Sequence, residues 1–110
     1  MSTKHRLITI VKLPDMTDAV TLKTGWIPRI NSHYRLQWEA AQSAYVLLYP
    51  EGMIRLNDSG GEILSLCSGD ITIEDLIDEL KRKFPDAESL EQDVLEFLSV
   101  AFERNWLTHD

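Results

Sequence analysis

The run from Tyr45 to Asn57, which leads straight into a helix start, constrains the fold more than any other part of the chain. Residues 44–49 are apolar on both faces, which is typical of a central strand. Residues 50–52 contain a proline, which fixes φ early in a turn, and a glycine, which tolerates positive φ at the exit. Residues 53–56 are again typical of a strand. The run leaves no loop long enough for a catalytic site, and it places an edge strand beside a helical unit, an arrangement suited to holding another chain.

A further strand precedes this run, so the sequence predicts a three-stranded antiparallel meander. Residues 34–38 alternate strictly between apolar and polar side chains, which indicates a half-buried strand. The connection at 39–43 is short enough for a hairpin. Residues 1–32 lack sustained helical periodicity and have strand propensity only at Leu7–Val11. We therefore expect a flexible or loosely docked extension over residues 1–32, followed by a folded domain that begins near His33.

Three helices follow the predicted sheet, and each starts with a capping pattern. A polar capping residue is followed three positions later by an acid or an amide: Ser59 and Glu62, Thr72 and Asp75, Ser89 and Gln92. The first helix is expected to end at Gly69, the second just before Pro85, and the third at about Trp106. A small sheet followed by three helices makes the predicted fold class α+β.

The third predicted helix carries a wide apolar sector. Its two adjoining stripes consist of Leu90, Val94, Phe97 and Ala101, and of Leu95, Leu98, Phe102 and Trp106. Together they cover about half of the helix circumference, whereas a helix packed on a core needs a stripe little wider than about 100°. Two interpretations stay open. Either the surplus lines a groove for a partner, or the neighbouring helices and the sheet bury all of it.

The charge distribution argues against nucleic acid as the partner of the helical half. The 110-residue chain has a net charge of −7, with +3 over residues 1–30, −1 over residues 31–60 and −9 over residues 61–110. An acidic surface repels the phosphate backbone of DNA or RNA.

Cysteine usage and hydropathy indicate the compartment. Cys67 is the only cysteine, so no intrachain disulfide can form, and we expect a reducing cytoplasm. No apolar run approaches the roughly 20 residues of a membrane span. The N-terminal region lacks the small-residue cleavage site that is typical of a secretory signal.

Patterns that carry chemistry are missing from the sequence. His5, His33 and His109 are isolated from one another, so no metal-ligand spacing exists. Cys67 lies among apolar residues with no histidine nearby in sequence, which favours a small buried side chain over a nucleophile. The pair Gly60–Gly61 lacks the following lysine of a phosphate-binding loop. We therefore expect that the protein is not an enzyme and that it holds no metal and no cofactor.

Several segments in combination resemble the pyrroloquinoline quinone biosynthesis protein D (PqqD) family. They are Arg35-Leu-Gln-Trp-Glu39, Tyr45–Asn57, Glu62-Ile-Leu64, Leu66-Cys-Ser-Gly69, Asp93-Val94, Phe97-Leu98 and Asn105-Trp-Leu107. The likeness extends over Ile27–Leu107 and is specific only as a combination of motifs. The chain departs from the family pattern at Gly60–Gly61, where alanines are usual, at Ser68, where aspartate is expected, and at Asn105, where glycine is common.

The resemblance implies a winged-helix-like domain over residues 33–107 that acts as a peptide chaperone, also called a RiPP recognition element. Proteins of this kind bind the precursor peptide PqqA and present it to PqqE, a radical S-adenosylmethionine enzyme that cross-links a Glu and a Tyr of the peptide. In related recognition elements the leader peptide adds as a strand beside the third strand, in a groove against the third helix. The peptide site expected here consists of Met53, Ile54, Arg55, Leu56, Val94, Leu95, Leu98 and Phe102.

Two other functions compete with this interpretation. A winged-helix DNA-binding protein has the same architecture, but its recognition helix would present Arg, Lys, Asn or Gln side chains to the bases. The other competitor is an enzyme that acts on the quinone or on its precursor. The sequence leaves the oligomeric state open between a monomer and a domain-swapped dimer.

Overall fold

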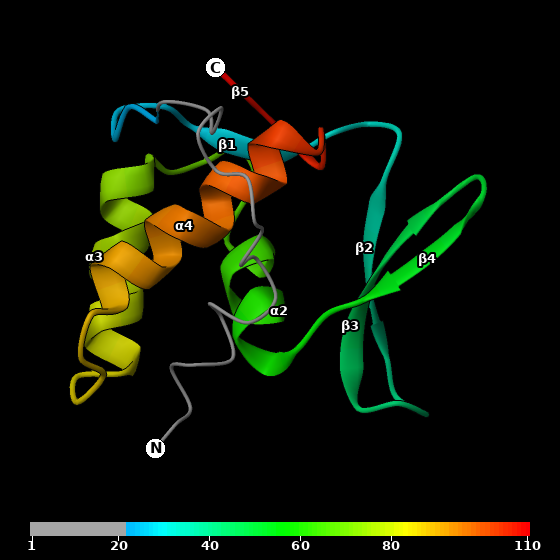
Figure 1. The fold of residues 1–110 in the computed structure, drawn as a ribbon, viewed down its shortest axis with the longest axis horizontal. Coiled ribbons are helices and arrows are strands. Elements are labelled where there is room, and N and C mark those ends of the chain that lie inside the picture. The colour runs from blue at the N-terminus through cyan, green and yellow to red at the C-terminus, as the bar shows by residue number, and fades with distance from the viewer. Residues whose placement is uncertain (1–21) are drawn as a thin grey trace.

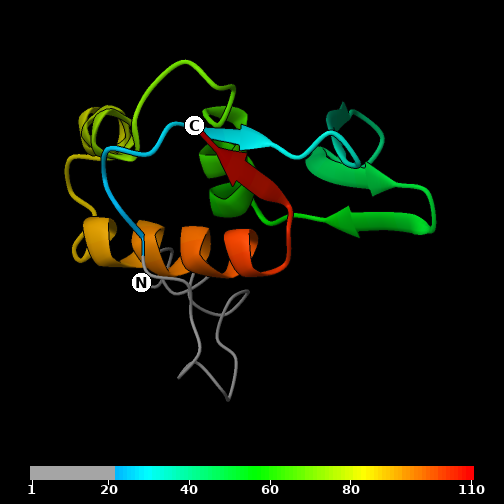
Figure 2. The same cartoon turned by 90° about the horizontal axis from the view of Figure 1, so that it is seen from above.

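The computed structural model describes residues 22–110, and its helices and strands form two distinct parts. In chain order the elements are β1 (Pro28–Ile30), β2 (Arg35–Glu39), β3 (Ala44–Tyr49), β4 (Gly52–Arg55), α2 (Asp58–Ser65), α3 (Ile73–Lys83), α4 (Leu90–Glu103) and β5 (Leu107–His109). Strands β2, β3 and β4 form an arm, residues 35–55, that projects from a body made of the three helices with β1 and β5 (Figure 1). The view from above shows the same separation (Figure 2). The α+β prediction, a three-stranded sheet followed by three helices, is confirmed.

The arm is the predicted antiparallel meander, with the strand order β2-β3-β4. Its middle strand β3 carries Val46 and Leu47, which point to opposite faces and are both fully buried. Val46 lies opposite Gln37 of β2 on one side and opposite Arg55 of β4 on the other. This position explains why residues 44–49 are apolar on both faces, whereas the flanking strands alternate.

A second, two-stranded sheet lies outside the prediction. Residues 28–30, which the sequence analysis assigns to the extension, form β1 and pair antiparallel with β5, with Pro28 opposite His109. Pro28 hides this strand in the sequence, but a proline is compatible with the first residue of an edge strand. Trp26 stacks on His109 at 3.7 Å between ring centroids and an interplanar angle of 4°. The two ends of the described chain are therefore packed together.

Backbone hydrogen bonds attach this N-terminal segment to the helices as well. The Gly69 amide donates to the Pro28 carbonyl at 3.0 Å, and the Ile73 amide donates to the Trp26 carbonyl at 2.9 Å. For these residues a domain boundary at His33 is too late. The strand expected at Leu7–Val11 lies outside the described residues.

The three helix starts differ in how far they follow the predicted caps. Thr72 caps α3 as expected, because its side chain accepts from the Asp75 amide at 3.1 Å. Helix α2 is capped by Asn57 rather than by Ser59, and the Asn57 side chain accepts from the Gly60 amide at 2.7 Å. Ser89 precedes α4 but has a left-handed backbone with φ 58° and makes no side-chain cap. The spacing rule cannot distinguish these cases because a neighbouring Asn can serve equally well.

Helix α4 ends at Glu103, three residues before the expected end at Trp106. Asn105 has φ 65°, a left-handed conformation that asparagine tolerates better than most residues and that terminates helices. The Trp106 amide then donates to the Ala101 carbonyl at 2.9 Å, which closes the helix end. The chain reverses at this point and enters β5.

Two glycines of α2 allow close packing, Gly61 against the arm and Gly60 against helix α4 of the body. A Cβ atom at Gly61 would lie 2.7 Å from Cδ2 of Tyr45 on β3, a distance that real Cβ contacts do not reach. A Cβ atom at Gly60 would lie 3.1 Å from Cε1 of Phe97 on α4. Glycine is less favourable than alanine in a helix by about 1 kcal/mol per residue. This cost is offset by close packing that alanine would disturb.

The Gly61→Ala substitution tests this close packing. We expect it to lower the free energy of unfolding by about 1–2 kcal/mol, because the overpacking penalty exceeds the gain in helix propensity. Gly25→Ala is the matched control, since nothing lies within 4 Å of its Cβ position, and it should change stability by less than about 0.5 kcal/mol. Denaturant unfolding of the three proteins measures both values. A Gly61→Ala protein as stable as the parent would contradict the packing constraint.

Candidate functional site

The outer edge of β4 is the first part of the candidate site. Strand β4 lies at the end of the sheet, and within residues 22–110 it pairs only with β3. The Leu56 amide donates to the Tyr45 carbonyl at 3.0 Å, so Leu56 and Tyr45 form a hydrogen-bonded pair of the antiparallel ladder. Because such pairs alternate along a ladder, the N–H and C=O groups of Met53 and Arg55 point away from β3. They are available to a strand added at this edge.

The side chains of β4 divide between the two faces of the sheet as the sequence predicts. Met53 and Arg55 are exposed, and Met53 retains 49% of its accessible surface. Ile54 is half-buried and packs against the core, and Leu56, just beyond the strand, is buried in it. An added strand would therefore meet backbone groups along the edge, with Met53 and Arg55 on one face and Ile54 on the other.

The apolar sector of α4 is mostly occupied by the core of the protein itself. Val94, Leu98 and Phe102, three of the expected site residues, are buried in the core cluster. Phe102 packs edge-on against Trp26 at 5.3 Å between ring centroids and is also in contact with the ring of His109. Leu95 is the expected helix residue that remains half-buried. Of the two interpretations of the wide sector, burial by the chain itself accounts for most of its residues.

The edge strand β4 approaches the body at only one of its ends (Figure 1). The hairpin turn before β4 lies at the far tip of the arm, and the chain enters the body after Arg55 through Leu56 and Asn57 (Figure 1). A strand added along β4 would therefore run along the arm and approach the body near the Arg55 end. The expected residues fall into an accessible strand group and a largely buried helix group.

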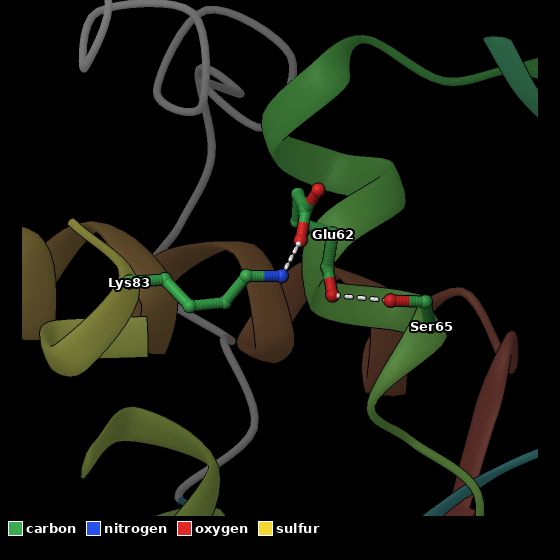
Figure 3. Close-up of polar contacts among 3 residues, drawn as sticks. All are labelled: Glu62, Ser65 and Lys83. Atoms are coloured by element: carbon green, nitrogen blue, oxygen red, sulfur yellow. Dashed lines mark hydrogen bonds and ion pairs between the residues drawn. The ribbon is translucent and has the colours of Figure 1, made fainter. Parts of the chain in front are cut away.

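Ion pairs connect the helices of the body at its surface. Nζ of Lys83 at the end of α3 lies 2.8 Å from Oε1 of Glu62 on α2, and Oγ of Ser65 donates to the Glu62 carbonyl at 2.8 Å (Figure 3). The hydrogen bond from Lys83 to Glu62, together with the charge of that carboxylate, raises the pKa of Lys83. Lys81 of α3 also lies 3.4 Å from Glu91 at the start of α4. These exposed contacts link α3 to both neighbouring helices, and α2 in turn packs against the arm at Gly61.

The remaining candidates for chemistry have structural roles in the described residues. Cys67 is buried, its Sγ donates to the Ile63 carbonyl at 3.4 Å, and burial raises the pKa of its thiol to about 12. A thiol that stays protonated at neutral pH is a poor nucleophile. Residues 22–110 contain no group of three or more His, Cys, Asp or Glu side chains placed to hold a metal ion. They also contain no helix long and apolar enough to cross a bilayer.

Helix α4 does not offer a DNA-reading surface. Between Leu90 and Glu103 it contains no Lys or Arg, and its accessible carboxylates are those of Glu91, Glu96 and Glu103, whereas Asp93 is buried. A recognition helix with this composition would repel the phosphates on either side of a groove.

The raised pKa of Cys67 predicts a specific dependence of stability on pH. The folded state keeps the thiol proton up to about pH 12, whereas the unfolded thiol ionises above its ordinary value of 9.0. This contribution to stability is complete below pH 9 and decreases as the pH rises towards 12, by about 1.4 kcal/mol per pH unit. Denaturant unfolding between pH 8 and 10 should show this decrease in the parent and lack it in Cys67→Ala. Equal slopes for the two proteins would contradict a buried, neutral thiol.

Sequence reasoning placed the strand correctly but missed two features of the site. The outward direction of the Met53 and Arg55 backbone groups depends on the register with β3, which no property of residues 53–56 reveals. The cover of Phe102 comes from Trp26, 76 positions earlier in the chain and in the segment assigned to the extension. Only the alternation of residues 53–56 was a usable signal.

The chain is similar to known proteins of one family. The family model described as Coenzyme PQQ synthesis protein D (PqqD) matches residues 44–107. The PqqA binding protein of Azotobacter vinelandii is 49% identical over 81 residues, which cover 74% of this chain and 88% of that protein. The PqqA binding protein of Acinetobacter baylyi is 50% identical over 80 residues, which cover 73% of this chain and 81% of that protein.

One solved structure has the same fold. It is the PqqD truncation of Methylobacterium extorquens PqqCD, described as a functional and stand-alone RiPP recognition element. The two chains superpose with a TM-score of 0.65 at 24% identity, and the match covers 80% of this chain and 95% of the other.

Proposed function

Because this chain belongs to the coenzyme PQQ synthesis protein D (PqqD) family, we propose that it binds the precursor peptide PqqA and presents it to the radical S-adenosylmethionine enzyme PqqE. The names of the relatives support the first half of the proposal, since the similar proteins of Azotobacter and Acinetobacter are PqqA binding proteins. The proposed role is that of a chaperone without catalysis of its own, acting in the cytoplasm, where the single thiol of Cys67 stays reduced.

The observation that carries the proposal is the free edge of β4. Outward N–H and C=O groups at Met53 and Arg55 offer a peptide the same hydrogen bonds that β3 receives on the other side. Binding by strand addition makes few demands on peptide sequence, because the affinity comes from main-chain bonds and the specificity from pockets for alternate side chains. A chaperone needs to hold a peptide extended and leave its reacting side chains accessible to an enzyme. An edge strand meets this need.

The proposed site combines the strand group with the accessible part of the helix. Met53, Ile54, Arg55 and Leu56 supply the edge, and Leu95 supplies apolar surface on α4. Val94, Leu98 and Phe102 are buried in the core against which Leu95 packs. Arg55 is the only cation of β4 and is exposed, so it is placed to pair with a carboxylate of the peptide.

Replacing Arg55 with proline tests the edge directly. The substitution removes one outward N–H but no bond to β3, and proline is tolerated at a sheet edge when its nitrogen faces outward. We expect at least about tenfold weaker binding of a synthetic PqqA peptide by titration calorimetry, because a backbone hydrogen bond is lost and the ring obstructs the added strand.

Arg55→Ala is the matched control, since it removes the side chain but keeps the N–H group. It should retain most of the affinity, and circular dichroism should show that both variants are folded. A folded Arg55→Pro protein that binds PqqA like the parent would exclude β4 as the docking edge. Equal losses in the two variants would assign the binding energy to the arginine charge instead.

The presentation step has its own test. We expect PqqE to modify PqqA faster when this protein is present, and we expect the gain to be reduced in Arg55→Pro at PqqA concentrations below saturation. Mass spectrometry of the peptide measures the cross-link. If the protein binds PqqA but leaves the rate of modification unchanged, it is a PqqA-binding protein without the proposed delivery role.

A further inference from the structure

Strand β2 forms the other end of the sheet, and its outer side pairs with nothing in the described part of the chain. Since Tyr45 exchanges its hydrogen bonds with β4, the neighbouring Val46 directs its backbone groups towards β2 and forms a hydrogen-bonded pair with Gln37. By the same alternation, the N–H and C=O groups of Leu36 and Trp38 point outward. The arm thus has two open edges on opposite sides.

The sequence of β2 is complementary to itself when read in the antiparallel direction. The strand reads Arg35-Leu-Gln-Trp-Glu39, with a cation at one end, an anion at the other and Gln37 in the middle. In a pair of such strands related by a two-fold axis at Gln37, Arg35 faces Glu39 of the second copy, twice. Leu36 faces Trp38 of the second copy, also twice. Opposite charges and apolar pairs at directly opposite positions stabilise antiparallel strands.

We propose that β2 is a self-association edge, at which two copies of this chain pair as antiparallel β2 strands and form a continuous six-stranded sheet. The backbone fits this arrangement. Leu36 and Trp38 both direct their groups outward, so each Leu36–Trp38 pair across the axis is of the hydrogen-bonded type. Moving the axis from Gln37 to Leu36 would place Glu39 opposite His33 and remove both Arg35–Glu39 pairs. The charges therefore select one register among those that the backbone allows.

The surface of β2 carries what this interface needs. Trp38 retains 54% of its accessible surface, the largest fraction among the large apolar side chains of the described residues. Its ring packs edge-on against Tyr45 of its own chain at 5.2 Å between centroids, and the exposed half of its surface is available to Leu36 of the second copy. On the opposite face, Gln37 accepts from Arg35 at 3.4 Å and donates to Glu39 at 2.6 Å, so both charged side chains extend along the strand.

The size of the strand sets the strength of the association. Five residues of edge cannot bury the roughly 1,200 Å² that stable interfaces usually reach, so we expect a weak dimer that forms at high protein concentration. Because its charge pairs are exposed, salt should weaken it. Both β4 edges lie at the outer ends of the six-stranded sheet and stay open. The inference is therefore independent of the proposed PqqA site and compatible with it.

Charge reversal with complementation tests the interface. Arg35→Glu places two carboxylates opposite each other in both charge pairs, and Glu39→Arg places two guanidinium groups opposite each other in both. Sedimentation equilibrium should show the parent dimerising, and each single variant dimerising at least about tenfold more weakly. The double variant R35E/E39R should recover the affinity of the parent, because opposite charges face each other again in both pairs.

An equimolar mixture of the two single variants should recover association as well. In the mixed dimer one charge pair joins the two substituted residues and the other joins the two original ones. The first pair places the new carboxylate opposite the new guanidinium, and the second is an unchanged Arg35–Glu39 pair. Because the two substituted positions face each other, both pairs of the mixed dimer are of opposite charge.

Arg55→Glu is the matched control, a reversal of the same charge at the other edge, and it should leave dimerisation unchanged. Circular dichroism confirms that each variant is folded. The proposal is overturned if the parent stays monomeric up to about 1 mM at low salt, where exposed charge pairs are strongest. It is also overturned if the parent dimer is insensitive to either reversal, or if the mixture and the double variant fail to recover association.

Discussion

The contact between α2 and the aromatic rings on either side of it determines the geometry of the molecule. A Cβ atom at Gly61 would lie closer to Tyr45 of β3 than real Cβ contacts reach, and a Cβ atom at Gly60 would require Phe97 of α4 to shift by a few tenths of an ångström. The contact between Gly61 and Tyr45 packs the arm against the body where the chain passes from β4 into α2. Asn57 caps α2 at the same point and thereby fixes where the strand ends and the helix begins. This tightly packed junction lies at the end of β4, where the open edge of the arm meets the body.

This construction favours binding through the backbone over chemistry through side chains. The described residues that are buried are mostly apolar, the single thiol is neutral, and charged side chains form ion pairs at the surface between helices. The arm, in contrast, presents two edges of main-chain donors and acceptors. Natural proteins usually cover or shorten such edges to avoid aggregation. Here β4 is short and followed at once by a helix, and β2 is charged at both ends, so each edge accepts only a limited range of partners.

The sequence predicted elements well and their tertiary relations poorly. Alternation at residues 34–38 and 53–56 and the double-sided apolar run at 44–49 located the three strands of the arm, because period two follows from strand geometry alone. Strand β1 was missed because its three residues start with proline, and its partner β5 lies about eighty residues away. The wide apolar sector of α4 was correctly seen, but its cover by Trp26 and His109 depends on contacts between the two ends of the chain. Local patterns do not encode such contacts.

Amide exchange on the uniformly labelled protein, with and without a PqqA peptide, tests strand addition at β4 most directly. The outward N–H groups of Met53 and Arg55 exchange freely with solvent if nothing pairs with them. Strand addition predicts that both amides become protected when PqqA binds and that they show nuclear Overhauser contacts to the peptide backbone. Protection that appears at Leu36 and Trp38 of β2, while Met53 and Arg55 continue to exchange, would contradict β4 as the peptide edge.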